Sequence, residues 1–158
     1  MRNSPVAHDN DFSEMLSDPI VRDCRLDRFL NMAKPLCLDI PRSKKHVSLI
    51  IRKGRLMAVG TNIFKGHPLA KTLGYRFEEQ HSELNALLKC QEKDKLILLN
   101  ARFNKNLEMR MARPCPLCLP WCVGVFQEIY YTCPDGKVRL LDNRPKEDHN
   151  LTSLLLAG

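Results

Sequence analysis

Three cysteines and three prolines are concentrated in residues 111–122, which read MARPCPLCLPWC. Two of these cysteines, Cys115 and Cys118, are separated by two residues, a spacing typical of metal ligands. A helix is expected to begin here, and the N–H groups and dipole of a helix start favour the thiolate form. Because the same spacing also occurs in structural and redox sites, further ligands must decide its chemistry.

A histidine and a glutamate supply a third ligand and a base. His81 opens an expected helix in QHSELNALL, two residues before Glu83. Side chains two apart on a helix point roughly 200° away from each other, so one can bind metal while the other moves protons. Three ligands leave one zinc position open for water, and a neutral His/Cys/Cys site acidifies that water only weakly, so a nearby carboxylate becomes useful. The order His-x-Glu, then Pro-Cys-x-x-Cys, is typical of zinc-dependent nucleobase deaminases.

The remaining pattern predicts alternating helices and strands that must position these residues. Apolar residues at helical spacing predict a helix in residues 23–36, ended by Pro35. Two β-rich runs around Lys53-Gly54 predict an antiparallel hairpin, followed by a helix in residues 82–90 and a buried strand in residues 95–100. Residues 129–142 predict two strands joined by CPDG, a turn too short for a parallel crossover. Pro120 and Gly124 weaken the helix expected after Cys118, so that it is kinked or starts late.

The motifs resemble those of the cytidine and deoxycytidylate deaminase superfamily. The similar segments are AVGTN, HPLAK, HSELNAL, RPCPLCL and IYYT. The resemblance implies an α/β fold of three layers: a mixed five-stranded sheet with helices on both faces, its last two strands an antiparallel hairpin. It also implies one catalytic Zn²⁺ held by His81, Cys115 and Cys118, with Glu83 as the proton shuttle. Asn62, in Gly60-Thr61-Asn62, is implied to contact the substrate sugar.

Length and composition favour one domain. The 158 residues, 44% of them hydrophobic, suit a single deaminase domain over residues 19–158 after a polar lead, residues 1–18. No apolar run is long enough for a membrane span, and the start lacks a secretory h-region, so we expect a cytoplasmic protein without a membrane partner. Four further cysteines lie among apolar neighbours and are expected to be reduced core thiols: Cys24, Cys37, Cys90 and Cys133.

The charge distribution bears on the substrate. The net charge is +7, and residues 40–77 carry nine basic side chains and no acidic one. Arg110 and Arg113 approach the cysteines from the other side, so they are candidate substrate contacts. Such a surface favours a cytosine-bearing single strand of nucleic acid over a mononucleotide, because many phosphates gain from many cations. Trp121 and Phe103 are candidates for stacking on a base, with packed core as the alternative for both.

Several alternatives stay open at this point. The basic surface also fits a protein that is merely soluble, or a deaminase of free (deoxy)cytidine or (deoxy)cytidylate. Cys122 is a candidate fourth ligand that would close a structural zinc site or join an iron–sulfur cluster, although neither site explains Glu83. A catalytically idle, zinc-stapled nucleic-acid-binding protein is the alternative from a different class. The favoured reading is a hydrolytic, zinc-dependent conversion of cytosine to uracil, and the sequence leaves the oligomeric state open.

Overall fold

The computed structural model describes residues 17–40, 46–75, 79–142, 144 and 146–157. Most of the predicted polar lead, and the basic residues Arg42, Lys44, Lys45 and Arg76, lie outside this part. The helices are α2 (Cys24–Asp39), α3 (Pro68–Thr72), α4 (Ser82–Lys89), α5 (Leu119–Val125) and α6 (His149–Leu156). The strands are β1 (Ile20–Val21), β2 (His46–Arg52), β3 (Arg55–Thr61), β4 (Ile63–Phe64), β5 (Glu79–Gln80), β6 (Leu96–Arg102), β7 (Phe126–Thr132) and β8 (Val138–Leu140).

Six strands form one mixed sheet in the order β1-β8-β7-β6-β2-β3. β6 and β7 are parallel, whereas the other neighbours are antiparallel. The predicted antiparallel hairpin of the last two strands is therefore confirmed, with β7 and β8 as its arms. The sheet has one strand more than the five expected, because the two-residue β1 pairs with the edge of β8. β4 and β5 form a separate two-stranded sheet.

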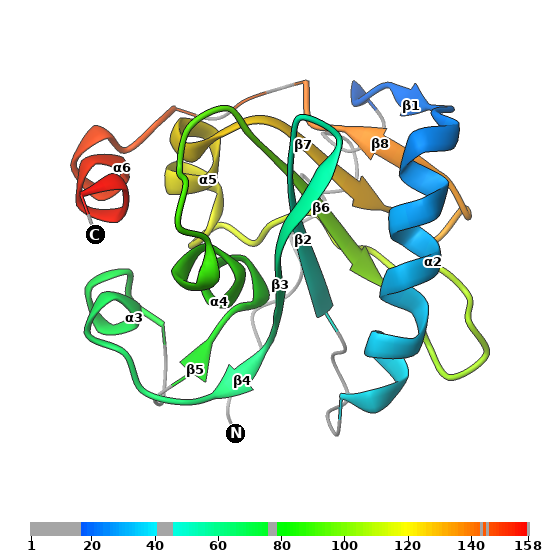
Figure 1. The fold of residues 1–158 in the computed structure, drawn as a ribbon, viewed down its shortest axis with the longest axis horizontal. Coiled ribbons are helices and arrows are strands. Elements are labelled where there is room, and N and C mark those ends of the chain that lie inside the picture. The colour runs from blue at the N-terminus through cyan, green and yellow to red at the C-terminus, as the bar shows by residue number, and fades with distance from the viewer. Residues whose placement is uncertain (1–16, 41–45, 76–78, 143, 145, 158) are drawn as a thin grey trace, which may run out of the picture.

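Helices cover both faces of the main sheet. Figure 1 shows α2 on one side and α4, α5 and α6 on the other. The apolar stripe predicted for the first helix is buried against β2 and β6, and α4 and α5 pack over the opposite face. Strand residues alternate between the two cores, as expected for a sheet covered on both faces: Leu49 joins the α2 core and Ile50 the α4 core. The predicted three-layer α/β fold is confirmed.

Prolines and glycines explain where local expectations hold and where they do not. α2 continues through Pro35 to Asp39, so the predicted end at Pro35 is wrong. Pro35 is exposed, so water can donate a hydrogen bond to the helix carbonyl that proline leaves without an N–H partner. The buried side chain of Cys37 keeps the last turn of the helix packed on the core. The β2–β3 turn uses Lys53 and Gly54 with φ of 50° and 73°, as the hairpin prediction requires.

The helix after Cys118 forms despite its proline and glycine. α5 begins at Leu119, so Pro120 falls in the first turn, where its missing N–H costs no helix bond. A Cβ at Gly124 would overlap the side chains of Thr152 and Glu147. The absence of a side chain at Gly124 therefore lets α6 pack close to α5.

The cysteines outside the 111–122 segment have two kinds of environment. Cys37, Cys90 and Cys133 are buried free thiols, as predicted. Cys24 is exposed at the start of α2, so its assignment to the core is wrong. In the part of the chain that the structure describes, each helix is too short or too polar to cross a membrane.

Gly60 sets the distance between β3 and α4. A Cβ built at Gly60 would lie 2.7 Å from Ala86 Cα and closer still to Ala86 N and Ser82 O. Those atoms belong to the helix backbone and cannot rotate away. Gly60→Ala should therefore displace α4, with an overpacking cost of about 1–3 kcal/mol. A thermal melt should show a Tm loss of roughly 2–4 °C per kcal/mol, and the displaced helix should lose zinc affinity.

Val59→Ala is the matched control for this prediction. Val59 packs with the core on the other side of the sheet, so its truncation should cost stability without changing zinc affinity. Unchanged Tm and zinc affinity in Gly60→Ala would contradict the close approach of β3 and α4.

Candidate metal and active site

Two helix starts and one turn bring three metal-capable side chains together. His81 is the N-cap residue of α4, and Cys118 is the N-cap residue of α5. A turn in which Cys118 N donates to Cys115 O at 3.0 Å carries the second cysteine beside the first. The candidate ligand atoms of His81, Cys115 and Cys118 all lie within 4.8 Å of one another. The three residues selected by spacing thus form one cluster.

The spacing of the donor atoms fits a tetrahedral zinc site. His81 Nδ1 lies 3.5 Å from Cys115 Sγ and 3.5 Å from Cys118 Sγ. Zinc bonds of about 2.3 Å to sulfur and about 2.0–2.1 Å to nitrogen, at a tetrahedral angle, place those donors roughly 3.6 Å apart. One imidazole and two thiols are also a donor set that zinc prefers. The side chains present therefore fit Zn²⁺ and leave a fourth position for water.

Hydrogen bonds and burial shift the pKa values of the two cysteine thiols in opposite directions. The pKa of Cys115 is lowered to about 4, chiefly by its hydrogen bond with Cys118, with a further contribution from His81, although burial opposes the shift. Burial raises the pKa of Cys118. Burial alone would lower the pKa of His81, but the hydrogen bond with Cys115 raises it. Cys115 is therefore the thiol more readily ionised for a metal.

Glu83 lies beside the cluster without joining its ligand atoms. Its carboxylate is buried, and Oε2 lies 3.8 Å from Cys118 Sγ. Oε1 accepts a hydrogen bond of 2.7 Å from Asn100 Nδ2. Burial raises the pKa of Glu83, against the effect of the hydrogen bond from Asn100. The arrangement suits a group that exchanges protons next to a metal.

A buried polar network beneath Glu83 was missed by sequence reasoning. Ser48 Oγ donates to Asn100 Oδ1 at 2.6 Å and lies 2.7 Å from Ser82 Oγ. Ser48 and Asn100 are directly paired across β2 and β6, on the face that α4 covers. Their sequence signal is one polar residue within the apolar interior of each of two strands, HVSLIIR and LILLNAR. Because the amide of Asn100 is held by Ser48, it fixes the orientation of Glu83.

A pocket of about 280 Å³ opens onto the cluster. Its lining is His46, Asn62, Glu79, His81, Ser82, Glu83, Arg113 and Cys115. Asn62 Oδ1 accepts a hydrogen bond from His46 N at 3.1 Å, which holds this side chain at the pocket. The Arg113 side chain is buried, and its Nε lies 3.7 Å from Asp18 Oδ2. The structure thus brings two of the predicted substrate contacts, Asn62 and Arg113, to the predicted zinc ligands.

The other predicted substrate contacts do not line this pocket. Trp121 is fully buried in the α4–α5 core, and Phe103 packs in the core on the α2 side. Both rings therefore follow the packing alternative, and their predicted stacking on a base is not supported. Arg110 is exposed beside Glu108, with 3.8 Å between the charged groups. Sequence distance from Cys115 did not predict which way these side chains face.

Part of the basic stretch of residues 40–77 lies far from the pocket. His46 and Asn62 mark the pocket end of the β2–β3 hairpin, whereas Lys53 occupies the turn at its other end. Seven extended residues span roughly 20 Å. The Arg52 guanidinium at the far end pairs with Glu92 and Asp94. Arg52, Lys53 and Arg55 therefore do not belong to a basic surface at the pocket, contrary to their inclusion in the substrate-binding charge expected from the sequence.

Cys122 is separate from the ligand cluster. Its side chain is fully buried, and among the described residues the group of metal-capable side chains contains only His81, Cys115 and Cys118. Cys122→Ala should therefore retain about one zinc per chain and lose about 1 kcal/mol of stability, typical of a small core change. Metal analysis and a thermal melt check both expectations. Release of zinc by this variant would restore the four-ligand alternative.

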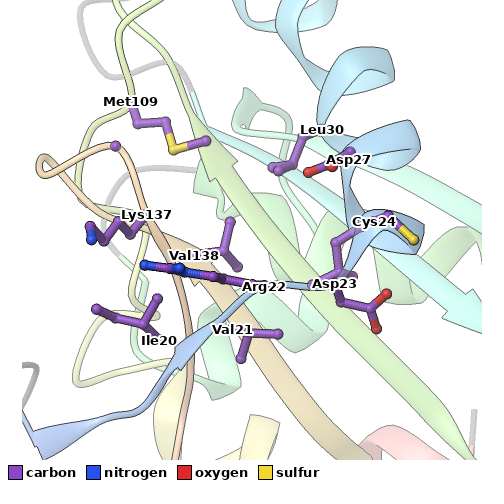
Figure 2. A pocket seen from close by; sticks show the side chains of 12 residues that line it. Ile20, Val21, Arg22, Asp23, Cys24, Asp27, Leu30, Met109, Lys137 and Val138 are labelled. Carbon is purple, nitrogen blue, oxygen red and sulfur yellow. The ribbon is translucent and has the colours of Figure 1, made fainter.

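A different pocket of about 450 Å³ lies on the α2 side of the sheet (Figure 2). It is formed around β1, the start of α2 and the β7–β8 turn, and side chains of both charges line it, among them Arg22, Asp27 and Lys137. None of the predicted site residues lines it. Chemistry at the His/Cys/Cys cluster therefore belongs to the smaller pocket.

Comparisons with known proteins give similarity in structure. No protein-family model matches the chain, and no curated protein matches it in sequence. A structure of the dCMP deaminase from the cyanophage S-TIM5, in complex with dCMP and dUMP, is similar at 17% identity and a TM-score of 0.49, covering 70% of this chain and 83% of that chain. The apo form of that enzyme is similar at 16% identity and a TM-score of 0.49, covering 85% of this chain and 94% of that chain. Residue roles are therefore drawn from the geometry of the site itself.

Proposed function

We propose that this protein is a zinc-dependent hydrolytic deaminase that converts cytosine to uracil. The observation that carries the proposal is the cluster of His81, Cys115 and Cys118 with the buried carboxylate of Glu83 beside it, 3.8 Å from Cys118 Sγ. A zinc site that only stabilises the fold does not require a carboxylate beside it. Burying the carboxylate of Glu83, which Asn100 holds by a hydrogen bond, costs free energy, so its presence favours a catalytic role. The cluster also opens onto a pocket that can hold a substrate, which supports an enzyme over a structural metal site.

Each side chain has a role that follows from its position. Bound at His81, Cys115 and Cys118, Zn²⁺ would supply Lewis-acid activation of water. Glu83 would take one proton from the attacking water and deliver it to the ring nitrogen. It would then move the second proton, from the hydroxyl that has been added to the ring carbon, to the amino group, which leaves as ammonia. Asn100 would keep the carboxylate aimed at the open side of the site. Asn62 would position the substrate through a sugar hydroxyl.

The charges lining the pocket favour a small substrate. Among the described residues, Arg113 is the one permanently cationic side chain of the lining, and Glu79 and Glu83 oppose it. Arg113 is also paired with Asp18. Such a lining serves one phosphate at most, whereas a strand gains affinity from many cations. We therefore propose a free cytosine nucleoside or mononucleotide as the substrate, in place of the single strand that net charge alone favours.

An exposed aromatic ring supports the single strand as the second candidate. Phe64 in β4 is 72% exposed and follows Asn62 by two residues. Exposed aromatic rings stack on bases of single-stranded nucleic acid, each worth about 1–3 kcal/mol. Lys44 and Lys45 also directly precede the pocket residue His46 in the sequence.

A panel of substrates separates the two candidates. We expect turnover of cytidine, deoxycytidine or their monophosphates, and none of single-stranded DNA or RNA oligonucleotides, at two salt concentrations with uracil as the readout. Phe64→Ala should leave turnover of the small substrate within about twofold, because Phe64 does not line the pocket and exposed side chains outside a site usually have small effects. Oligonucleotide turnover that falls steeply with salt and drops in Phe64→Ala would favour the strand. Conversion of adenine alone would overturn the choice of base.

A further inference from the structure

Tyr75 contacts two of the three candidate zinc ligands, although it precedes the metal helix and belongs to no motif. Its ring stacks on His81 with centroids 4.1 Å apart and an angle of 6° between the planes. Its hydroxyl lies 2.8 Å from Cys118 Sγ. The side chain is buried, with 7% of the residue exposed. One tyrosine therefore bridges the histidine of α4 and the cysteine at the start of α5.

The direction of the hydrogen bond follows from its neighbours. Trp121 Nε1 lies 3.3 Å from the Tyr75 hydroxyl and can only donate, so the tyrosine oxygen accepts from the indole. A cysteine that ligates zinc is a thiolate and has no proton to donate. The O–H of Tyr75 is then directed at Cys118 Sγ. The chain of donors runs from Trp121 through Tyr75 to the sulfur.

We propose that Tyr75 is a positioning residue of the metal centre: its ring fixes the plane of His81, and its hydroxyl, held by Trp121, donates to the Cys118 thiolate. This inference rests on the proposed metal site. A hydrogen bond to a thiolate withdraws electron density from sulfur, so less charge is donated to the metal. That offsets the weak water activation of a site with two thiolates and no net charge. The buried Trp121 is thereby assigned a role in the site other than stacking on a base.

Cobalt(II) supplies a readout that does not depend on turnover. Sulfur-to-cobalt charge-transfer absorption moves to lower energy when the sulfur loses a hydrogen bond. Tyr75→Phe keeps the ring and removes only the hydroxyl, so Co²⁺ titration of the purified apoprotein should show this band at lower energy than in wild type. Co²⁺ affinity should fall by about 10–100-fold, as is typical when a partner of a metal ligand is removed. Tyr75→Leu, which also loses the stacking on His81, should bind Co²⁺ more weakly still.

Tyr130→Phe is the matched control. The Tyr130 hydroxyl bonds to Glu128 at the sheet, away from the cluster, so its loss should leave the band and the affinity unchanged. A band and an affinity in Tyr75→Phe equal to those of wild type and Tyr130→Phe would overturn the role of Tyr75 while leaving the metal site intact. A wild-type protein without any sulfur-to-cobalt band would overturn the metal site itself. Circular dichroism of each variant establishes that the fold is retained.

Discussion

Glu83→Gln should lower kcat/KM for cytosine deamination by about 10²–10⁴-fold, the contribution typical of a positioned general acid–base group. The amide replaces the carboxylate almost isosterically and still accepts the hydrogen bond from Asn100 through its oxygen. It cannot take a proton from water at neutral pH. Because Glu83 lies outside the group of ligand atoms, the zinc content should stay at about one per chain. Steady-state kinetics and metal analysis on the same preparation measure both quantities.

Glu92→Gln is the control for this substitution. Glu92 pairs with Arg52 near the far end of the β2–β3 hairpin and is half exposed, so its neutralisation should leave kcat/KM unchanged. Near-wild-type activity in Glu83→Gln would remove Glu83 from the mechanism. Loss of zinc in Glu83→Gln would indicate that Glu83 has a structural role. It would support the alternative of a catalytically inactive zinc-containing protein that binds nucleic acid.

The sequence predicted the parts of this molecule that depend on local pattern. Apolar spacing predicted the buried face of α2, Gly54 marked the β2–β3 turn, and the short CPDG segment required β7 and β8 to be antiparallel. In each case the signal and the structure it determines lie within a few residues of each other. The same holds for His81 and Glu83, which sit at the start of one helix.

Contacts between distant segments could not be predicted in this way. Ser48 meets Asn100 only because β2 and β6 pair in one particular register, since a shift of either strand by one residue would turn its polar side chain to the α2 face. Tyr75 reaches Cys118 across 43 positions of sequence. Trp121 follows the metal cysteines in the sequence, yet its ring points into the core, because a helix turns successive side chains by about 100°. These three features depend on packing between segments that are distant in the sequence, which local sequence patterns do not reveal.

Cys115→Ser should abolish tight zinc binding, and the effect should appear in stability as well as in metal content. A hydroxyl is a poor zinc ligand beside a thiolate, so the affinity should fall by more than the roughly 10–100-fold seen when only a partner of a ligand is removed. Zinc at 100 times its Kd stabilises a folded protein by about 2.7 kcal/mol. In a domain of this size that corresponds to a Tm increase of roughly 5–10 °C. The wild type should show this increase on addition of zinc, and Cys115→Ser should not.

Cys24→Ser is the control that makes this comparison specific to the site. Cys24 is an exposed free thiol outside the cluster, so its substitution should leave the zinc-dependent Tm increase intact. Thermal melts of both variants and the wild type, each with chelator and with added zinc, give the comparison directly. An equal zinc-dependent increase in Cys115→Ser would show that zinc binds elsewhere. The open coordination position that deamination requires would then no longer be located at His81 and Cys118, and the carboxylate of Glu83 would have no activated water to serve.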